Sequence, residues 1–371
     1  AAGTITTAKI ADGAITQAKT TGIGGGGKNV IENGEMSIAQ RGTSFASVGN
    51  VYTLDRFEFY KQNSGAAFTV SQNSVTDLAG FSYSLKVDCT TADTSLAANE
   101  QAYVSHKIFG RNCQRFAKGH GSDALTMTLS FYVKTNKTGL YTVSLFDRDN
   151  SRKVNGSYTV ANANWARYSI TFPADASGKL DNDNNSSLEL FFNLYAGADT
   201  NTGTLSETWA ASADAGSTTG QVNFADNTSN DWEITGIQLE TGSTASPFEH
   251  RLYSDHLYAC QYYFIRRMCD ASGDYPGAVV GWHSVSNYFN GITQFEREMR
   301  VTPTLVTSGS FRSQGHVDSG NASGTLTIAN ASNQACRLNG SGMSYSSTNG
   351  VAAILQSSGG SDYYIDFVAE L

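Results

Sequence analysis

One glycine-rich segment has the spacing of a nucleotide-binding motif. In GIGGGGKN, the residues Gly22, Gly27 and Lys28 stand at the intervals of a phosphate-binding P-loop. Such a loop needs a hydrophobic strand before it and, after it, a helix whose backbone amides point at the anion. Here a Thr/Ala-rich repeat precedes the segment and NVIENGEM follows it. We therefore interpret the segment as a flexible linker.

Paired carboxylates are a second set of residues that could do chemistry. Asp147 with Asp149, or Glu296 with Glu298, would project to one side of a strand, as the two acids of a glycoside hydrolase do. An arginine lies between the members of each pair, which favours solvated charged faces. The histidines form no HExxH or HxH pair, and no cysteine lies at zinc-ligand spacing from them. The sequence predicts no catalytic residues, no cofactor and no enzymatic activity.

A short acidic segment has the oxygen-ligand spacing of a calcium loop. Asp181, Asp183 and Asn185 alternate there as Ca²⁺ ligands can. The glycine of an EF-hand loop is missing, which favours a plain polar turn. Calcium at these three residues remains the minor alternative.

Aromatic residues suggest a binding function, because sugars stack on flat rings that β-scaffolds present. Trp209 lies in TWAASADAGSTTG, a stretch that cannot bury much, so its ring could stand on a loop where binding residues are usually found. Trp282 is a second candidate for exposure. Trp232, at the head of WEITGIQLE, could lie in a core or at a surface. We expect glycan contacts among these three tryptophans, whereas Trp165 within WARYSITF is expected to be structural.

Composition narrows the class of protein. The chain has 371 residues, which is enough for two domains and a tail, and its net charge of −8 argues against a nucleic-acid partner. No leader and no apolar run of about 20 residues is present, so neither export by a signal peptide nor membrane insertion is expected. Five cysteines without CxxC spacing suit assembly in a reducing cytosol, with at least one thiol free.

The elements that would position these residues are mainly strands. Between residues 29 and 248, apolar residues alternate with polar ones, as in the run from Leu125 to Val133 and the run from Leu188 to Leu194. Half-buried alternation in many short strands predicts a two-sheet sandwich or jelly roll. A short helix is expected after Tyr253, where Tyr253, Leu257, Cys260 and Phe264 recur at helical intervals. Beyond it the β pattern returns and continues through SDYYIDFVAEL.

The expected fold class is therefore all-β: a jelly-roll β-sandwich, a short helix and a second, smaller β domain, preceded by an extended repeat. We divide the chain into a repeat or anchor segment with a Gly-rich linker (1–28), a sandwich (29–248), a helical connector (249–268) and a C-terminal β domain (269–371). In the first segment Ile5 and Ile15 recur with a period of ten. Each unit can bury its isoleucine only against a neighbour, so we expect a self-associating stalk or a strip docked on another protein, with a disordered tail as the alternative.

The segment GIQLETGSTASPFEHRLYSDHLYACQYYF resembles phage tail-fibre and related virion-surface proteins. Those proteins often carry a QLE-x-G-x-x-x-x-PFE-x-R pattern that closes a jelly-roll domain. The matching residues are Gln238, Leu239, Glu240, Gly242, Pro247, Phe248, Glu249 and Arg251. The family's opening strand is matched by Asn33, Gly34, Gln40, Arg41, Gly42, Asp55, Arg56 and Phe57. We read the last three of these as a buried ion pair or a turn brace. MRVTPTL and DFVAEL are similar to the family's distal module.

The resemblance implies a carbohydrate-binding-module-like jelly roll, a homotrimeric fibre and recognition of a host surface. It places the protein on the virion, made in the host cytoplasm, with virion proteins bound through the N-terminal segment and a host glycan or receptor bound further along the chain. The leading hypothesis is therefore a structural attachment protein of tail-fibre type. One alternative is a capsid or tail decoration or scaffold protein that binds only virion proteins, and another is a polysaccharide-degrading tailspike enzyme.

Overall fold

The computed structural model describes residues 27–269, 277–285, 288–315, 324–343, 350–357 and 363–371. The ten-residue repeat and most of the glycine-rich segment lie outside the described residues. The chain divides into two compact units, Ala1–Tyr253 and Ser254–Leu371. Both units are built from antiparallel strands, which confirms the predicted all-β class.

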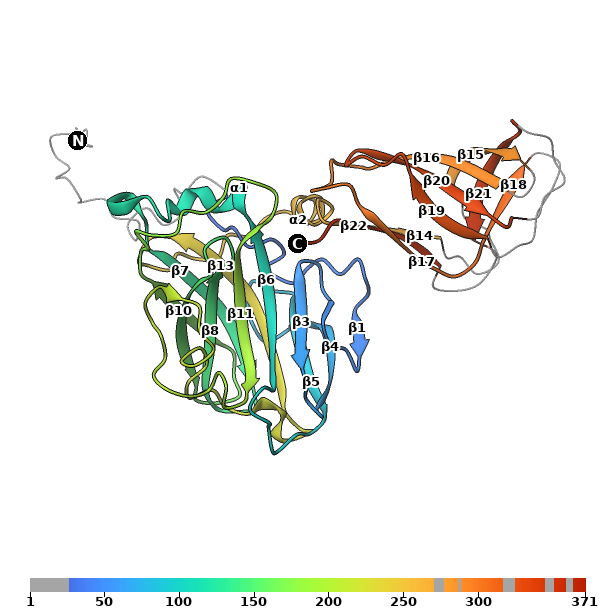
Figure 1. Cartoon of the computed structure of the whole chain (residues 1–371). Coiled ribbons are helices and arrows are strands. Elements are labelled where there is room, and N and C mark those ends of the chain that lie inside the picture. The colour runs from blue at the N-terminus through green and yellow to red at the C-terminus, as the bar shows by residue number, and fades with distance from the viewer. Residues whose placement is uncertain (1–26, 270–276, 286–287, 316–323, 344–349, 358–362) are drawn as a thin grey trace, which may run out of the picture. The chain divides into compact units, whose positions relative to one another are not determined.

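The first unit is a jelly-roll β-sandwich of two antiparallel sheets lying face to face (Figure 1). The first sheet has the order β1-β4-β5-β13-β7-β10, with strands β1 (Ser44–Ala46), β4 (Ala67–Ser74), β5 (Tyr83–Thr91), β13 (Asp231–Thr241), β7 (Met127–Thr135) and β10 (Ala166–Phe172). The second sheet has the order β12-β9-β8-β11-β6-β3-β2, with strands β12 (Ala210–Ala211), β9 (Arg152–Val160), β8 (Gly139–Asp147), β11 (Ser186–Ala196), β6 (Gln101–Phe109), β3 (Phe57–Gln62) and β2 (Val51–Tyr52). The connections carry the short helices α1 (Gly110–Cys113), η3 (Gln114–Phe116), η4 (Gly121–Asp123) and η5 (Phe224–Asp226).

The sandwich core lies between the two sheets because each strand turns its apolar residues to the same side. On β7 the alternating residues from Met127 to Val133 are fully buried, and so are those from Leu188 to Leu194 on β11. The rings of Phe131 and Phe192 meet edge to face across the core, with centroids 5.1 Å apart. The alternation predicted for these strands is confirmed from Met127 to Val133 and from Leu188 to Leu194, whereas Leu125, expected on the same face, precedes β7 and is 44% exposed. The remaining sides of the two sheets face outward, and that leaves room for a site on the sheet itself.

The segment that leads into the sandwich is folded tightly against β13. Asn33 has a left-handed backbone (φ 57°), and its side chain donates to the carbonyl oxygens of Ile38 and Asp55 at 2.9 Å. A Cβ atom at Gly34 would lie 2.2 Å from the carbonyl oxygen of Ile237, so no larger residue fits there. Asp55 braces the turn through the backbone N–H of Gln40 at 2.7 Å. The expected turn brace is therefore present.

Arg56 supplies the other half of that expectation. Its side chain is fully buried, and its Nε lies 3.7 Å from a carboxylate oxygen of Glu32. It also donates to the carbonyl oxygen of Lys107 at 2.6 Å, which ties β6 to the leading segment. Asp55 thus braces the turn, and the neighbouring Arg56 forms a buried ion pair with Glu32.

The residues of the PFE-x-R pattern join the two ends of the sandwich. The Glu249 carboxylate accepts the backbone N–H groups of Gly27 and, at 2.9 Å, of Asn29. Arg251 donates to the carbonyl oxygen of Asn29 at 2.8 Å, and Gln238 accepts the backbone N–H of Glu249 at 2.8 Å. We call Asn29, Gln238, Glu249 and Arg251 the clamp. It fixes the place where the chain enters the sandwich beside the place where it leaves.

We expect the substitution Glu249→Gln to destabilise the sandwich by about 1–3 kcal/mol, because two backbone donors lose their charged acceptor. Burial alone would raise the pKa of Glu249, but the donors at Asn29 and Gly27 and the nearby Arg251 lower it. The charged form is therefore the one that the clamp stabilises. Chemical denaturation of the whole chain would measure the effect. The matched substitution Glu207→Gln, at an exposed position, should cost less than about 0.5 kcal/mol. Equal effects of the two substitutions would show that the clamp contributes nothing.

The second unit packs two further sheets around its own core. The smaller sheet has the order β14-β22-β17, with strands β14 (Phe264–Met268), β22 (Tyr364–Val368) and β17 (Thr304–Ser308). The larger sheet has the order β18-β21-β15-β16-β20-β19, with strands β18 (Phe311–Gly315), β21 (Ala352–Ser357), β15 (Gly277–Val285), β16 (Tyr288–Gln294), β20 (Ala335–Ser341) and β19 (Thr325–Ala329). Phe289, Leu338, Leu355, Ile365 and Phe367 are fully buried in this core.

The helix α2 (Tyr253–Cys260) begins at the expected residue, but its buried face differs from the predicted one. His256 and Cys260 are buried, whereas Tyr253 is 62% exposed. Phe264, which we expected on the helix, begins strand β14 and pairs with Val368. Strand pairing with β22 therefore overrides the helical spacing, and residues 264–268 belong to a sheet and not to a helical connector. Cys260 and Phe264 are buried whereas Tyr253 is exposed, so the four residues do not form one apolar face of a helix.

Two further sequence features can be compared with the structure. All five cysteines are described, and each is a buried free thiol, as expected for at least one of them. Burial raises the pKa of Cys269 and of Cys336 to about 11, which makes their thiols unreactive at neutral pH. No helix in the described part of the chain is long and apolar enough to cross a membrane.

Candidate functional site

A groove of about 340 Å³ lies on the outward side of the second sheet of the sandwich. It is lined by Glu58, Tyr60, Tyr103, Lys107, Phe146, Arg148, Lys153, Glu189, Phe191 and Ser212, and we call this set the groove. On each strand these residues alternate with core residues, as Glu58 and Tyr60 do with Phe57 and Phe59. The same alternation that builds the core therefore presents the groove on a rigid surface.

Aromatic rings form one part of the groove. Tyr60 on β3 and Tyr103 on β6 are directly opposite in register and stack with centroids 4.7 Å apart and planes 11° apart. Phe191 on β11 meets the Tyr103 ring edge to face at 4.8 Å. All three side chains are partly exposed. Three neighbouring strands thus place apolar ring surface at an open face, which is the kind of surface that ligand sites use.

Charged groups form the rest of the groove. Lys107 pairs with Glu58 at 2.8 Å, and Arg148 pairs with Glu189. Arg148 and Lys153 each lie 5.8 Å from the centroid of the Phe146 ring, within cation–π range. The groove therefore combines apolar rings with hydrogen-bond donors and acceptors that point outward from β3, β6, β8, β9 and β11.

Burial in the groove shifts the protonation of several of these groups. Burial raises the pKa of the Glu189 carboxyl group, although Lys107 and Arg148 oppose the shift. Burial also lowers the pKa of Lys153, and Asp214 offsets only part of that effect. At Lys107 burial is outweighed by Tyr52 and Glu58, so its pKa is raised. Partial loss of water at charged groups is a common property of binding sites.

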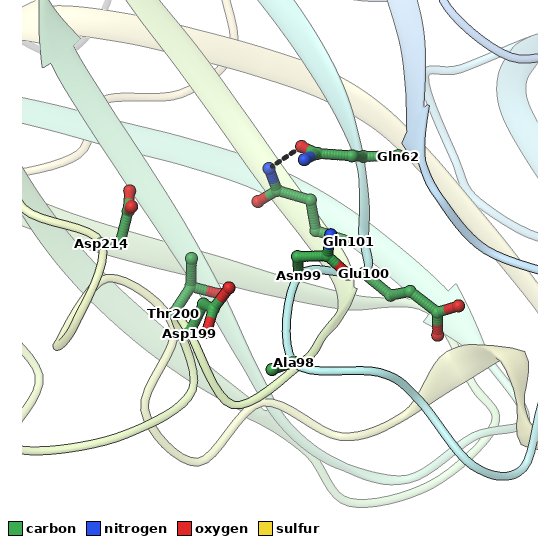
Figure 2. A pocket seen from close by; sticks show the side chains of 8 residues that line it. All are labelled: Gln62, Ala98, Asn99, Glu100, Gln101, Asp199, Thr200 and Asp214. Carbon is green, nitrogen blue, oxygen red and sulfur yellow. Dashed lines mark hydrogen bonds between the residues drawn. The ribbon is translucent and has the colours of Figure 1, made fainter.

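A second, smaller hollow of about 150 Å³ lies further along β3 and β6. Gln62 lies two residues after Tyr60 and Gln101 two residues before Tyr103, on the same side of their strands, and a hydrogen bond of 2.9 Å joins the two amides. Figure 2 shows these two amides on one side of the hollow, with Asp199, Thr200 and Asp214 on the other. The Tyr60 hydroxyl donates to Gln62 at 3.2 Å, so the groove and this hollow share a hydrogen-bonded edge. Together they form one continuous outward surface along β3 and β6.

Trp209 is not in the groove. Its indole N–H donates to the carbonyl oxygen of Pro173 at 2.9 Å, and its ring covers the ammonium group of Lys118 at 4.7 Å. Lys118 is completely buried between Asp147 and Asp175, the latter at 3.0 Å. The stretch that we expected to expose Trp209 instead covers this buried ion cluster. The ring is partly exposed, and a glycan contact there stays a prediction.

The other tryptophans are also outside the groove. Trp232 is fully buried and donates to the Tyr158 hydroxyl at 3.3 Å, so the expectation that it contacts a glycan is wrong. Trp232 occupies a position of β13 from which the side chain points into the core. Trp282 is partly exposed on β15 of the second unit, where a binding role stays a prediction. Trp165 donates to Asp77 at 2.9 Å.

The oxygen-rich segment before β11 is used within the loop. Asn185 donates its backbone N–H to Asp183 at 2.9 Å, and the carbonyl oxygens of Asp181 and Asp183 accept from Gln114 and Arg111 at 3.0 and 3.1 Å. Among the described residues, no group of three or more His, Cys, Asp or Glu side chains could hold a metal ion. The three residues therefore form a braced polar turn, and the calcium alternative gains no support from this structure.

The candidate carboxylate pairs do not come together as pairs. Asp147 is fully buried against Lys118, whereas Asp149 accepts the backbone N–H of Asp181 at 2.9 Å. In the second unit, Glu296 pairs with Arg267 at 3.2 Å and Glu298 accepts from Asn333 at 2.6 Å. Each carboxylate thus has a separate structural partner.

The sequence reasoning missed the groove, although part of its signal is visible. Tyr60, Tyr103 and Phe191 stand out of phase with the buried residues of their strands, in FEFYKQ, AYVSH and LELFFNL. An aromatic residue at an outward position of a sandwich strand has no core to fill. The exposed rings of this groove therefore lie on strands and not on loops.

Comparisons with known proteins find solved structures that align with this chain, but they identify no family for it. No family model and no curated protein matches the sequence. Solved structures that align with the chain include a candidate sugar-binding protein from Bacteroides thetaiotaomicron, with 13% identity and a TM-score of 0.32 over 58% of this chain and 100% of that one. TmCBM61 in complex with β-1,4-galactotriose aligns with 6% identity and a TM-score of 0.30 over 58% of this chain and 100% of that one.

A family 11 carbohydrate-binding module from Clostridium thermocellum, in complex with a β-1,3-1,4-mixed-linked tetrasaccharide, is also similar. It has 14% identity and a TM-score of 0.28 over 56% of this chain and 98% of that one. At such identities and scores, the ligands of these proteins do not identify the ligand of this chain. The jelly-roll description rests on the strand order of the chain itself.

Proposed function

We propose that this protein is a non-enzymatic carbohydrate-binding protein and that the groove binds an oligosaccharide. The observation that carries the proposal is the set of outward rings of Tyr60, Tyr103 and Phe191, placed beside paired charges on one rigid sheet. A sugar ring presents a C–H face that packs on an aromatic ring and hydroxyl groups that need polar partners. The groove offers both at once.

We further propose that the chain serves as a virion-surface protein of tail-fibre type that attaches a phage to its host cell. The support for this step is the sequence resemblance, whose PFE-x-R residues form the clamp. The proposed partners are a host glycan or receptor, further copies of the chain in a homotrimer, and virion proteins bound through the N-terminal segment. Weak contacts in three grooves would combine through multivalency.

The test is binding of the purified full chain to a panel of bacterial surface glycans and to whole cells of candidate hosts, with light scattering on the same sample. We expect saturable binding to at least one glycan by an oligomer, and no release of reducing ends. A well-folded chain that binds neither glycans nor cells would contradict attachment and favour a decoration or scaffold role. Release of reducing ends that is lost in Glu296→Ala or Asp149→Ala would instead establish a tailspike enzyme.

A further inference from the structure

The charges of the groove do not balance, and the imbalance falls on Lys153. The two carboxylates in the lining already have cationic partners, Lys107 for Glu58 and Arg148 for Glu189. The ion pairs of the described residues include none at Lys153, whose ammonium group donates to the neutral Ser217 hydroxyl at 3.2 Å. One positive charge of the groove therefore has no ion-pair partner among the described residues, and Asp214 compensates it only in part.

The position of Lys153 suits a ligand that also contacts a ring. Lys153 on β9 is directly opposite Phe146 on β8 in the register of the two strands, and its ammonium group lies 5.8 Å from the centre of that ring. Both side chains are partly exposed. Burial lowers the pKa of Lys153, and the charge of Asp214 opposes this shift only in part.

We propose that the groove selects acidic oligosaccharides, with Lys153 binding an anionic substituent of a sugar whose ring lies against Phe146. The inference rests on the proposed function, because it names the ligand class of the same groove. The shared chemistry is a set of anionic oxygen atoms, which a hexuronate carboxylate, a phosphate ester or a sulfate ester can supply.

The net charge of the whole chain bears on the cause of this selectivity. At a net charge of −8, the chain as a whole repels polyanions at long range. Binding of an acidic glycan would therefore need a local cation and could not come from general attraction. Lys153 is a cation of the groove that forms no ion pair with a carboxylate of the described residues, although the charge of Asp214 acts on it.

The experiment compares the full-length wild-type chain with Lys153→Gln in calorimetric titrations. The probes are hexuronate oligosaccharides, their methyl esters, a phosphodiester-linked teichoic acid and a sulfated dextran, together with neutral oligosaccharides of similar length. We expect one acidic class to bind, and its affinity to fall by about tenfold or more in Lys153→Gln. The methyl esters should bind the wild type as weakly as the acids bind the variant. Lys134→Gln, on the other sheet and paired with Asp77 at 2.7 Å, is the matched control and should bind like the wild type.

The outcomes separate this inference from the proposed function. Binding of neutral oligosaccharides in the groove with no acidic preference would overturn the inference and leave the proposed function intact. Acidic binding that Lys153→Gln does not change would also overturn it. If no glycan binds the wild type, both fail together. Thermal unfolding of Lys153→Gln should match or exceed the wild type, because the substitution removes a partly buried charge, so a binding loss will not reflect unfolding.

Discussion

Replacing both stacked tyrosines of the groove, Tyr60→Ala with Tyr103→Ala, is expected to weaken glycan binding by about a hundredfold or more. Aromatic residues at the centre of a site typically contribute about 2 kcal/mol or more each, and 1.4 kcal/mol is a factor of ten in affinity. The two rings meet at 4.7 Å, so losing both also removes the surface that each presents to the other. Calorimetric titration with the glycan found in the panel would measure the change.

Three further variants make this result interpretable. Tyr60→Phe with Tyr103→Phe keeps the ring surface and removes the hydroxyl groups, so it should retain most of the affinity if stacking dominates. Tyr83→Ala removes a ring that is 37% exposed and lines a separate hollow beside His250. Binding that survives the double alanine variant but is lost in Tyr83→Ala would move the site to that hollow. Binding lost in Trp282→Ala alone would move it to the second unit.

Replacing the buried lysine, Lys118→Ala, is expected to destabilise the sandwich by about 3–5 kcal/mol. The substitution leaves the Asp147 carboxylate buried without its cation and leaves Asp175 paired with Arg152 alone, and breaking a buried ion pair on one side costs this much. It also removes the donor to the carbonyl oxygen of Gly178 at 2.8 Å. Denaturant titration of the full chain would measure the loss. The control Lys134→Ala, in an exposed pair, should cost about 1 kcal/mol or less.

The pH dependence of stability provides a second readout of the same cluster. Burial would raise the pKa of Asp175, but Arg152 and Lys118 outweigh it and lower the pKa below its ordinary value. The stabilisation is therefore present above the ordinary carboxyl pKa of about 3.9 and is lost as the pH falls through the lowered one. In Lys118→Ala this acid-dependent part should shrink. A double variant with Asp175→Asn should lose less than the sum of the two single losses, and strict additivity would argue against a coupled cluster.

The general fold could be predicted because alternation is a local property of the sequence. The runs ending at Val133 and Leu194 mark strands wherever their partners lie, since each side of a sandwich sheet repeats every second residue. Phe264 shows the limit of such patterns. Its spacing from Cys260 fits a helix, yet its pairing with Val368, about a hundred residues away, makes it part of a strand.

The groove could not be predicted because its residues meet only through strand pairing. Tyr60 and Tyr103 are far apart in the sequence, and Phe191 is further still, so no spacing connects them. The pairing order β8-β11-β6-β3 brings them together, and the sequence of a single strand does not reveal that order. Trp209 was expected on an exposed loop, and the local sequence was misleading there. Its surroundings look solvated in sequence, but in the fold its ring covers Lys118.

The clamp determines how tension passes through the molecule. Glu249 and Arg251 hold Gly27 and Asn29 at the place where the chain leaves the sandwich. A pull between residue 27 and residue 252 therefore loads these few hydrogen bonds directly, and Gln238 passes part of the load to β13 of the first sheet, whereas the groove lies on the second sheet. In the proposed attachment role, tension between the particle and the cell would therefore reach the clamp before it reached the residues of the groove.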